Sequence, residues 1–222
     1  MGALFATVLA GLAMVGPTPA GSATGHVIAA VHTPVSVLAA PAGPTVARLG
    51  TRTRFGSPRT LSVLARSGRW LEVATAGLPG RRYGWVNADA AGLTFSVTPL
   101  SITVSLGTKT LELRSGSRVL RRFPVGVGAP DSPTPTGRFT VTDELRGGSY
   151  SPDYGCCILA LSARQTHLPA GWTGGDQIAI HGTNDPATID HADSAGCIHA
   201  RDDDLRYLME HVPLGTPVTI AR

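Results

Sequence analysis

A cysteine and two histidines lie in two short segments near the end of the chain, and these residue types suit acyl-transfer chemistry. Cys197 is part of DSAGCIHA, with His199 two residues later, and His181 lies sixteen residues upstream in AIHGT. A thiol beside an imidazole can give up its proton and attack a carbonyl carbon. Cys197 is therefore a candidate nucleophile, with a buried thiol, a disulfide half and a metal ligand as alternatives.

A metal site at these residues is not indicated by their spacing. The candidate ligands His181, His191, Cys197 and His199 follow one another at intervals of 10, 6 and 2 residues. These intervals match no recognised zinc pattern. We therefore expect no metal and no other cofactor.

A disulfide at Cys197 would need one of two neighbouring cysteines, Cys156 and Cys157. Adjacent Cα atoms lie about 3.8 Å apart, whereas an ordinary disulfide needs about 4.4–6.8 Å. A bond between these two neighbours would therefore be strained. In an exported chain one of them could instead pair with Cys197, and three cysteines leave one over.

The residues just before Cys197 favour a nucleophile. Ser194, Ala195 and Gly196 are small, so a substrate carbonyl could approach the thiol closely. The backbone N–H groups of Ala195, Gly196 and Cys197 could form an oxyanion hole, because glycine permits the dihedrals that such a loop needs. A thiolate–imidazolium pair would be the attacking form. These residues by themselves leave a buried structural thiol as an equal alternative.

The composition of the whole chain predicts a mainly β protein. Its 222 residues are enough for one or two domains, and 27 Gly and 17 Pro suit short strands and turns. Residues 24–99 carry eight arginines against two acidic residues, a net charge of +6, whereas residues 100–222 carry a net charge of −2. The basic part predicts an anionic partner. No nucleic-acid-binding motif appears, so we expect no nucleic acid.

The first 23 residues are typical of a signal peptide. An apolar run from Ala3 to Val15 is followed by helix breakers, and Gly21 and Ala23 suit a cleavage site. This predicts export to the periplasm or cell wall. An uncleaved membrane anchor or a misassigned start is the alternative, because no positive charge precedes the apolar run. Residues 24–33 are predicted to be a linker.

Residues 34–98 are predicted to form a small β-barrel domain. Short alternating strands are separated by Gly and Pro turns, as in TLSVLARSGRWLEV. The segments WLEV and GWV resemble those of bacterial SH3-like domains. The net charge of this domain predicts that it binds an anionic partner.

Residues 100–222 are predicted to form a second, mainly β domain. The segments SITVSL, TLELR and RVLRRFPVGVG predict a three-stranded meander, and CILALS, DQIAIHG and TPVTIA predict further strands. The segment SPTPTGRFTV predicts a proline-fixed loop that leads into a strand. Apolar residues recur at helical spacing in RDDDLRYLMEHV, which predicts one clear helix near the C-terminus.

The motifs of this second domain resemble those of a known family. AIHGT is followed after a dozen residues by SAGCI, with PTPTGRF upstream and VPLGTPV near the end. This combination resembles the L,D-transpeptidase (YkuD-type) catalytic domain, whose pattern is His-Gly-Thr followed by Ser/Thr-x-Gly-Cys. The resemblance covers about residues 100–220 and implies a YkuD-type β-sandwich.

The resemblance implies that Cys197 is the nucleophile and His181 the general base. The substrates would be peptidoglycan stem peptides, donor and acceptor, joined as 3→3 cross-links through a thioester, and carbapenem-type inhibitors would acylate the thiol. Tyr154 and Trp172 lie in a loop-rich stretch that could cap the cleft or simply pack. The resemblance also implies residues that bind the oxyanion and substrate or orient the base: Ser194, Ala195, Gly196, His199, Gly182 and Thr183.

Two positions depart from the commonest pattern of this family. Ala195 stands where many relatives carry His, and His199 stands where many carry Arg or Asn. The first change leaves the backbone N–H intact, and the second makes the charge of a donor depend on pH. Two alternatives to a transpeptidase therefore stay open: a non-catalytic wall-binding protein, and a thiol L,D-carboxypeptidase or hydrolase of stem peptides.

Overall fold

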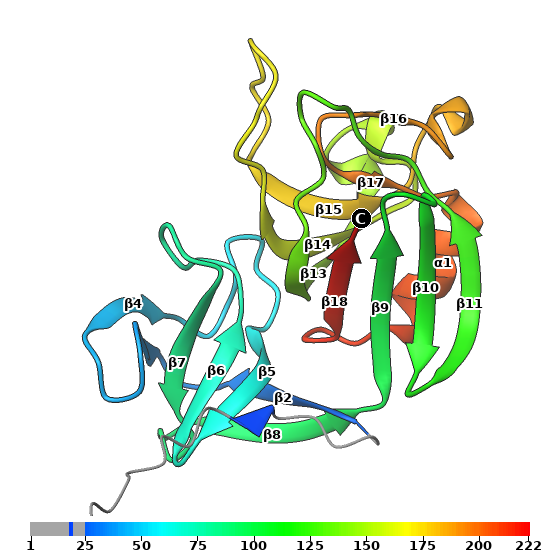
Figure 1. The fold of residues 1–222 in the computed structure, drawn as a ribbon. Helices are drawn as coiled ribbons and strands as arrows, with labels where there is room; N and C mark the ends of the chain where they lie inside the picture. The colour runs from blue at the N-terminus through cyan, green and yellow to red at the C-terminus, as the bar shows by residue number, and fades with distance from the viewer. Residues whose placement is uncertain (1–17, 20–24) are drawn as a thin grey trace, which may run out of the picture.

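The computed structural model describes residues 18–19 and 25–222. The predicted signal peptide, residues 1–23, lies outside the described residues except for Thr18 and Pro19. No helix in the described part of the chain is both long and apolar enough to cross a membrane. The described residues form two units, each with its own sheet and apolar core (Figure 1).

The first unit is a sheet of eight strands whose neighbours are antiparallel. Its order is β4-β3-β7-β6-β5-β2-β8, with β1 paired to β5. Buried Val and Leu side chains from alternating strand positions form its core. The SH3-like interpretation of residues 34–98 stays a prediction. The strands are β1 (Thr18–Pro19), β2 (His26–Val31), β3 (Val35–Leu38), β4 (Thr45–Leu49), β5 (Thr60–Ser67), β6 (Trp70–Ala74), β7 (Tyr83–Asn87) and β8 (Leu93–Thr98).

The prediction of a linker over residues 24–33 is wrong. His26–Val31 form β2, which pairs with β5 on one side and with β8 on the other. Ile28 and Ala29 point to opposite faces of the sheet and both are buried. The segment therefore lacks the polar alternation that would have marked it as a strand, and its short apolar run gave no periodic signal.

The second unit is a mixed sheet of order β11-β10-β9-β18-β13-β14-β15-β17, in which the β9–β18 and β15–β17 pairs are parallel. The predicted meander and final strand are confirmed. The strands are β9 (Leu100–Ser105), β10 (Thr110–Ser115), β11 (Arg118–Pro124), β13 (Gly137–Arg146), β14 (Cys157–Arg164), β15 (Gln177–His181), β17 (Ile198–His199) and β18 (Pro217–Ala221). A short parallel pair, β12 (Val127–Gly128) and β16 (Ala192–Ser194), lies beside it.

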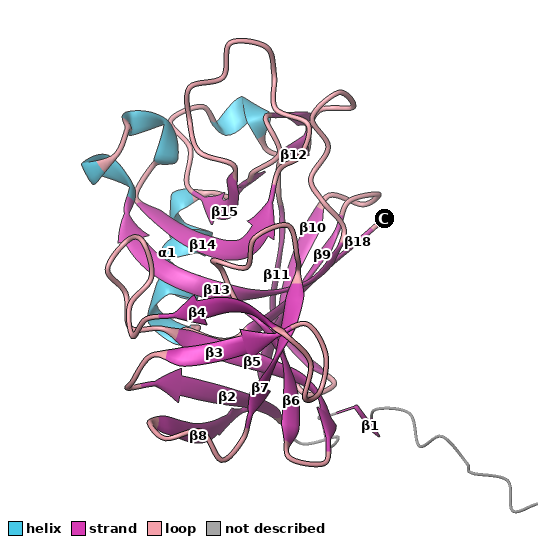
Figure 2. Ribbon diagram, turned by 90° about the vertical axis from the view of Figure 1, so that its left-hand side faces the viewer, coloured by secondary structure: helices cyan, strands magenta, loops and turns pink. Residues whose placement is uncertain are grey.

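The predicted C-terminal helix is confirmed as α1, Asp202–His211. It packs against β14 and β15 through Leu205 and Leu208, which are fully buried. The acidic residues of its first turn and Pro213 after its end agree with the expected helix signals. The mainly β class with one α-helix among the described residues is therefore confirmed, and all helical segments belong to the second unit (Figure 2). Three short 3-10 helices complete it: η1 (Gly147–Ser149), η2 (Pro152–Tyr154) and η3 (Pro186–Thr188).

Polar contacts join the two units near the start of β13. The Arg82 guanidinium donates to the carbonyl of Thr136 at 2.7 Å, and the Tyr83 hydroxyl donates to the carbonyl of Arg138 at 3.1 Å. Arg82 directly precedes β7 and Tyr83 is its first residue, so the beginning of this strand contacts the second unit.

Candidate active site

The parallel pairing of β15 and β17 brings the predicted site residues together. His181 ends β15 and pairs in register with His199, which ends β17, and Cys197 directly precedes β17. The ring centroids of the two histidines lie 4.7 Å apart. All three side chains line one cleft of about 570 Å³. The sheet register therefore assembles residues that are sixteen positions apart in the chain.

The imidazole of His181 is held in one orientation by its own backbone. Its Nδ1 lies 2.6 Å from the carbonyl oxygen of Gly182, so Nδ1–H donates there and Nε2 is left to accept a proton. Gly182 thus has the geometry of the predicted orienting group. Thr183, the other candidate, does not contact the ring through its hydroxyl, which donates to the carbonyl of Asp185 instead.

Burial shifts the pKa values of His181 and of the Cys197 thiol in the directions that favour their neutral forms. It lowers the pKa of His181, whose side chain is 5% exposed, to about 4, and the nearby His199 adds to this effect, while the bond to Gly182 partly opposes it. Burial also raises the pKa of the Cys197 thiol, with a backbone hydrogen bond at Ala179 partly opposing it. Both shifts favour a neutral thiol beside a neutral imidazole, so the thiolate–imidazolium pair expected as the attacking form is not favoured before a substrate binds. The proton must instead move during attack.

The loop before Cys197 is shaped by Ser194. The Ser194 hydroxyl accepts a bond from the N–H of Gly196 at 3.1 Å and donates to the carbonyl of Cys197 at 2.6 Å. The N–H of Gly196 is thus used inside the loop and is not free for an oxyanion, contrary to the sequence-based expectation. Of the three expected oxyanion donors, the N–H groups of Ala195 and Cys197 are still candidates.

Two polar side chains, Gln165 and Thr134, form a cradle that hydrogen-bonds the backbone of this loop, and no sequence pattern predicted these contacts. Gln165 Nε2 donates to the carbonyls of Ser132 and Ala195, each at 3.1 Å. The Thr134 hydroxyl donates to the carbonyl of Gly196 at 2.9 Å. The Ser and Thr residues that alternate with prolines in SPTPT were the available signal, but their partners lie about sixty residues further along the chain.

The second imidazole, His199, is fixed by a different contact. Its Nδ1 lies 3.0 Å from the hydroxyl oxygen of Thr188, which itself donates to the carbonyl of Asp185. The hydroxyl must therefore accept from Nδ1–H. Burial lowers the pKa of His199, and the charges of Asp193 and Asp185 partly oppose this. His199 is thus neutral near pH 7 and carries an unprotonated Nε2 (a second potential base).

The comparisons with known proteins concern the second unit, which carries this candidate site. The family model of the L,D-transpeptidase catalytic domain, YkuD, matches residues 99–220. The chain belongs to this family. Putative L,D-transpeptidase YkuD of Bacillus subtilis (strain 168) is 39% identical over 126 residues, which cover 56% of this chain and 67% of that protein.

Solved structures of L,D-transpeptidases are more distant from this chain. An L,D-transpeptidase from Mycobacterium smegmatis is 18% identical with a TM-score of 0.45, covering 85% of this chain and 99% of that one. The LD transpeptidase LdtMt1 in complex with imipenem is 20% identical with a TM-score of 0.46, covering 87% of this chain and 82% of that one. Membership of the L,D-transpeptidase family is therefore concluded from the sequence match and not from these structures.

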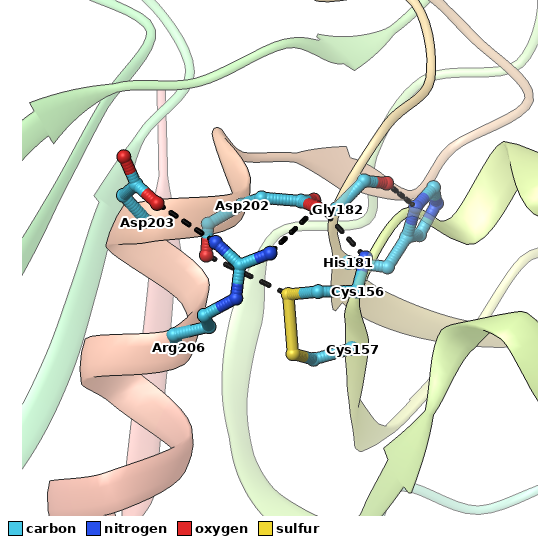
Figure 3. Close-up of a disulfide and its surroundings, with 7 residues drawn as sticks. All are labelled: Cys156, Cys157, His181, Gly182, Asp202, Asp203 and Arg206. Atoms are coloured by element: carbon cyan, nitrogen blue, oxygen red, sulfur yellow. Dashed lines mark hydrogen bonds and ion pairs between the residues drawn. A yellow bond between two sulfur atoms is a disulfide. The ribbon is translucent and has the colours of Figure 1, made fainter.

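In this L,D-transpeptidase family member, a disulfide joins Cys156 to Cys157, and Cys197 is free. The expected alternative, a bridge from one of them to Cys197, is therefore wrong. The disulfide lies between the start of α1 and the strand that carries His181 (Figure 3). The N–H of Cys156 donates to Asp202 Oδ1 at 3.1 Å.

The aromatic residues near the site differ in their positions. Tyr154 packs edge-on against the His181 ring, with centroids 4.8 Å apart, so it covers the base directly. Trp172 lines the same cleft and is exposed. Tyr154 thus has the position expected of a capping residue, while the role of Trp172 stays a prediction.

We expect Gly196→Ala to damage the loop that carries the thiol. Gly196 has a φ of +115°, and a Cβ there would lie 2.2 Å from Gln165 Nε2. The backbone strain alone costs about 1–3 kcal/mol, and displacement of Gln165 would release the carbonyl of Ala195. Acylation of Cys197 by a carbapenem should slow by more than about 10-fold, which corresponds to about 1.4 kcal/mol.

The matched control for this variant is Gly68→Ala. Gly68 has a φ of +58°, a Cβ added there would have no atom within 4 Å, and the residue lies in the turn between β5 and β6. The variant should lose some thermal stability and keep the acylation rate. Equal acylation rates in the Gly196→Ala variant and the wild type would contradict the role given to this loop.

Proposed function

We propose that the chain is an exported cysteine L,D-transpeptidase that forms 3→3 cross-links between peptidoglycan stem peptides. The observation that carries this proposal is the shared cleft of Cys197 and His181, with the base oriented by the carbonyl of Gly182. Family membership supports the reaction class, and the N-terminal segment supports export to the periplasm or cell wall.

The proposed reaction uses the neutral pair described above. Sγ of Cys197 attacks the carbonyl carbon of the third residue of a tetrapeptide donor while its proton moves to Nε2 of His181. The N–H groups of Ala195 and Cys197 stabilise the oxyanion. The C–N bond then breaks, His181 returns the proton to the amine of the leaving D-alanine, and a thioester is left on Cys197.

The second half of the reaction releases the enzyme. The side-chain amine of a second stem peptide attacks the thioester carbonyl and His181 takes its proton. The C–S bond then breaks to give the cross-link, and His181 passes the proton to Sγ to restore the free thiol. Water in place of the amine would release a tripeptide and make the protein a carboxypeptidase.

The test is incubation of the mature protein with a disaccharide-tetrapeptide, followed by mass spectrometry. A cross-linked dimer supports the transpeptidase. A tripeptide as the only product would show the carboxypeptidase alternative, and an unchanged substrate would favour the non-catalytic wall-binding protein.

The acylation rate should be nearly independent of pH across the neutral range. Because the pKa of His181 is lowered to about 4, this ring does not gain a proton as the pH falls from about 7.5 to about 5.5, and the pKa of His199 is lowered in the same direction. The rate should change less than about 2-fold there and fall as the pH approaches 4. The measurement is donor consumption against pH. An inflection near pH 6.5 would contradict the lowered pKa values.

We propose that the basic first unit binds an anionic wall polymer, in line with the SH3-like prediction. Not all of its arginines are available for this: Arg59 is 9% exposed and bonded to backbone carbonyls, and Arg69 pairs with Asp89. Binding of the whole chain to carboxylate- or phosphate-bearing glycans should weaken steeply up to physiological salt, where charges are screened within about 8 Å. An affinity that does not change with salt concentration would indicate sugar stacking on Trp70 or Trp85 instead.

A further inference from the structure

A loop of the first unit forms part of the wall of the catalytic cleft. The chain between β4 and β5, residues 50–59, reaches the second unit, and Arg54 and Phe55 line the same cleft as Cys197 and His181. The first unit therefore contributes side chains to the site where the proposed substrate would bind.

This loop is held in place by a partly buried contact between the units. The Thr53 hydroxyl donates to Oδ1 of Asp143, a carboxylate on β13 that is 0% exposed. Inside the loop, the N–H of Gly56 donates to the carbonyl of Thr53 at 3.2 Å. Since breaking this bond would leave the buried Asp143 oxygen without its donor, the contact favours a loop that is positioned before any substrate arrives.

A second buried group fixes the base of the loop. The guanidinium of Arg59 donates to the backbone carbonyls of Gly50, Arg52 and Ala76 at 2.7, 2.7 and 3.0 Å. These bonds tie the two ends of the loop together. The cost of ordering it is met during folding, which favours binding through pre-organised side chains.

Arg54 is the charged residue that this loop presents to the cleft. Its guanidinium lies over the Phe55 ring, 4.7 Å from the centroid, and Phe55 packs edge-on against Tyr150 with centroids 6.1 Å apart. Among the described residues that line the cleft, Arg54 is the only Arg or Lys, and it has neither a salt-bridge partner nor a hydrogen-bond acceptor there.

The acidic side chains of the cleft already have partners of their own. Asp153 accepts bonds from Ser151 and Asn184. Asp176 pairs with Arg164, and Asp185 caps the 3-10 helix η3. The Arg54 guanidinium, which lies over the Phe55 ring, is thus a positive charge of the cleft without a partner among the described residues. The carboxylates of the cleft accept bonds from other groups of the chain.

We propose that Arg54 binds a carboxylate of the stem peptide and so makes the first unit part of the substrate site. This inference rests on the proposed function. A planar guanidinium matches a carboxylate through two parallel N–H···O bonds. The donor tetrapeptide ends in the carboxylate of its D-alanine, and other carboxylates of the stem share the same chemistry.

The experiment measures peptide binding in a Cys197→Ala background, where no turnover occurs. Isothermal titration calorimetry compares the tetrapeptide as the free acid with the same peptide carrying a C-terminal amide. Arg54→Gln should weaken binding of the free acid about 10-fold, as expected for the loss of one charge-assisted pair. Arg54→Lys should recover part of that loss.

The matched control is Arg48→Gln, which removes the same charge from an exposed position on β4 outside the cleft. It should leave the affinity unchanged. If amidation removes the effect of Arg54→Gln, the partner is the terminal carboxylate; if the effect persists, it is another carboxylate of the stem, and the proposal stands in both cases.

Equal affinities for both peptides with and without the Arg54→Gln substitution would overturn the proposal, as would the absence of measurable binding to the Cys197→Ala protein. Failure of the proposed function would appear separately, as a wild-type protein that does not convert the tetrapeptide. The two outcomes are distinguishable because binding and turnover are measured on different proteins.

Discussion

Cys197→Ala is expected to abolish acylation and cross-linking while leaving the fold intact. The thiol is the atom that forms the thioester, so its removal leaves no nucleophile for the covalent intermediate. The side chain is small and half-buried, so the substitution leaves little empty space. The measurement is the mass of the intact protein after incubation with a carbapenem, which should increase in the wild type only.

Thermal unfolding is the control for this variant. A melting temperature close to that of the wild type would show that the missing adduct reflects the missing thiol. A carbapenem adduct on the Cys197→Ala protein would show that another residue is acylated and that the assignment of the nucleophile is wrong.

His181→Ala is expected to slow acylation by about 10²–10⁴-fold, the range typical of a lost general base. The thiol has a raised pKa and does not ionise by itself near neutral pH, so attack depends on a neighbour that takes its proton. His181 is oriented for this by the carbonyl of Gly182, which leaves Nε2 free to accept. The measurement is the rate of carbapenem acylation at saturating inhibitor.

His199 provides the comparison, because it also carries an unprotonated Nε2 and lies 4.7 Å from His181 between ring centroids. His199→Ala should cost only about 10-fold, the value of one supporting hydrogen bond of about 1–1.5 kcal/mol. His199→Arg should be tolerated. The reverse order, with His199→Ala inactive and His181→Ala merely slowed, would make His199 the base.

The sequence by itself determined the family and the mainly β class with one helix, and it predicted the pair Cys197 and His181, which the fold brings to one cleft. These features are local. The motifs AIHGT and SAGCI are short and contiguous, and strand alternation and helical spacing are carried by neighbouring residues. The contact between Gly182 and the His181 ring could also be predicted from the sequence, because Gly182 is the next residue in the chain.

Tertiary structure decided the features that depend on contacts between distant residues. β2 became a strand through pairing with β5 and β8 on either side, which its own apolar run could not reveal. The cradle of Gln165 and Thr134 under the thiol loop joins residues about thirty to sixty positions apart.

The electrostatics of the site also required the fold. Burial, which no local pattern measures, favours the neutral forms of the thiol and His181, and the bond from Gly196 to Ser194 removes one expected oxyanion donor. The place of Arg54 in the cleft follows from the bond between Thr53 and Asp143, ninety residues apart. The contact between Thr53 and Asp143 forms only when the two units pack together. The sequence therefore predicts the candidate site residues, and the tertiary structure determines which groups surround them.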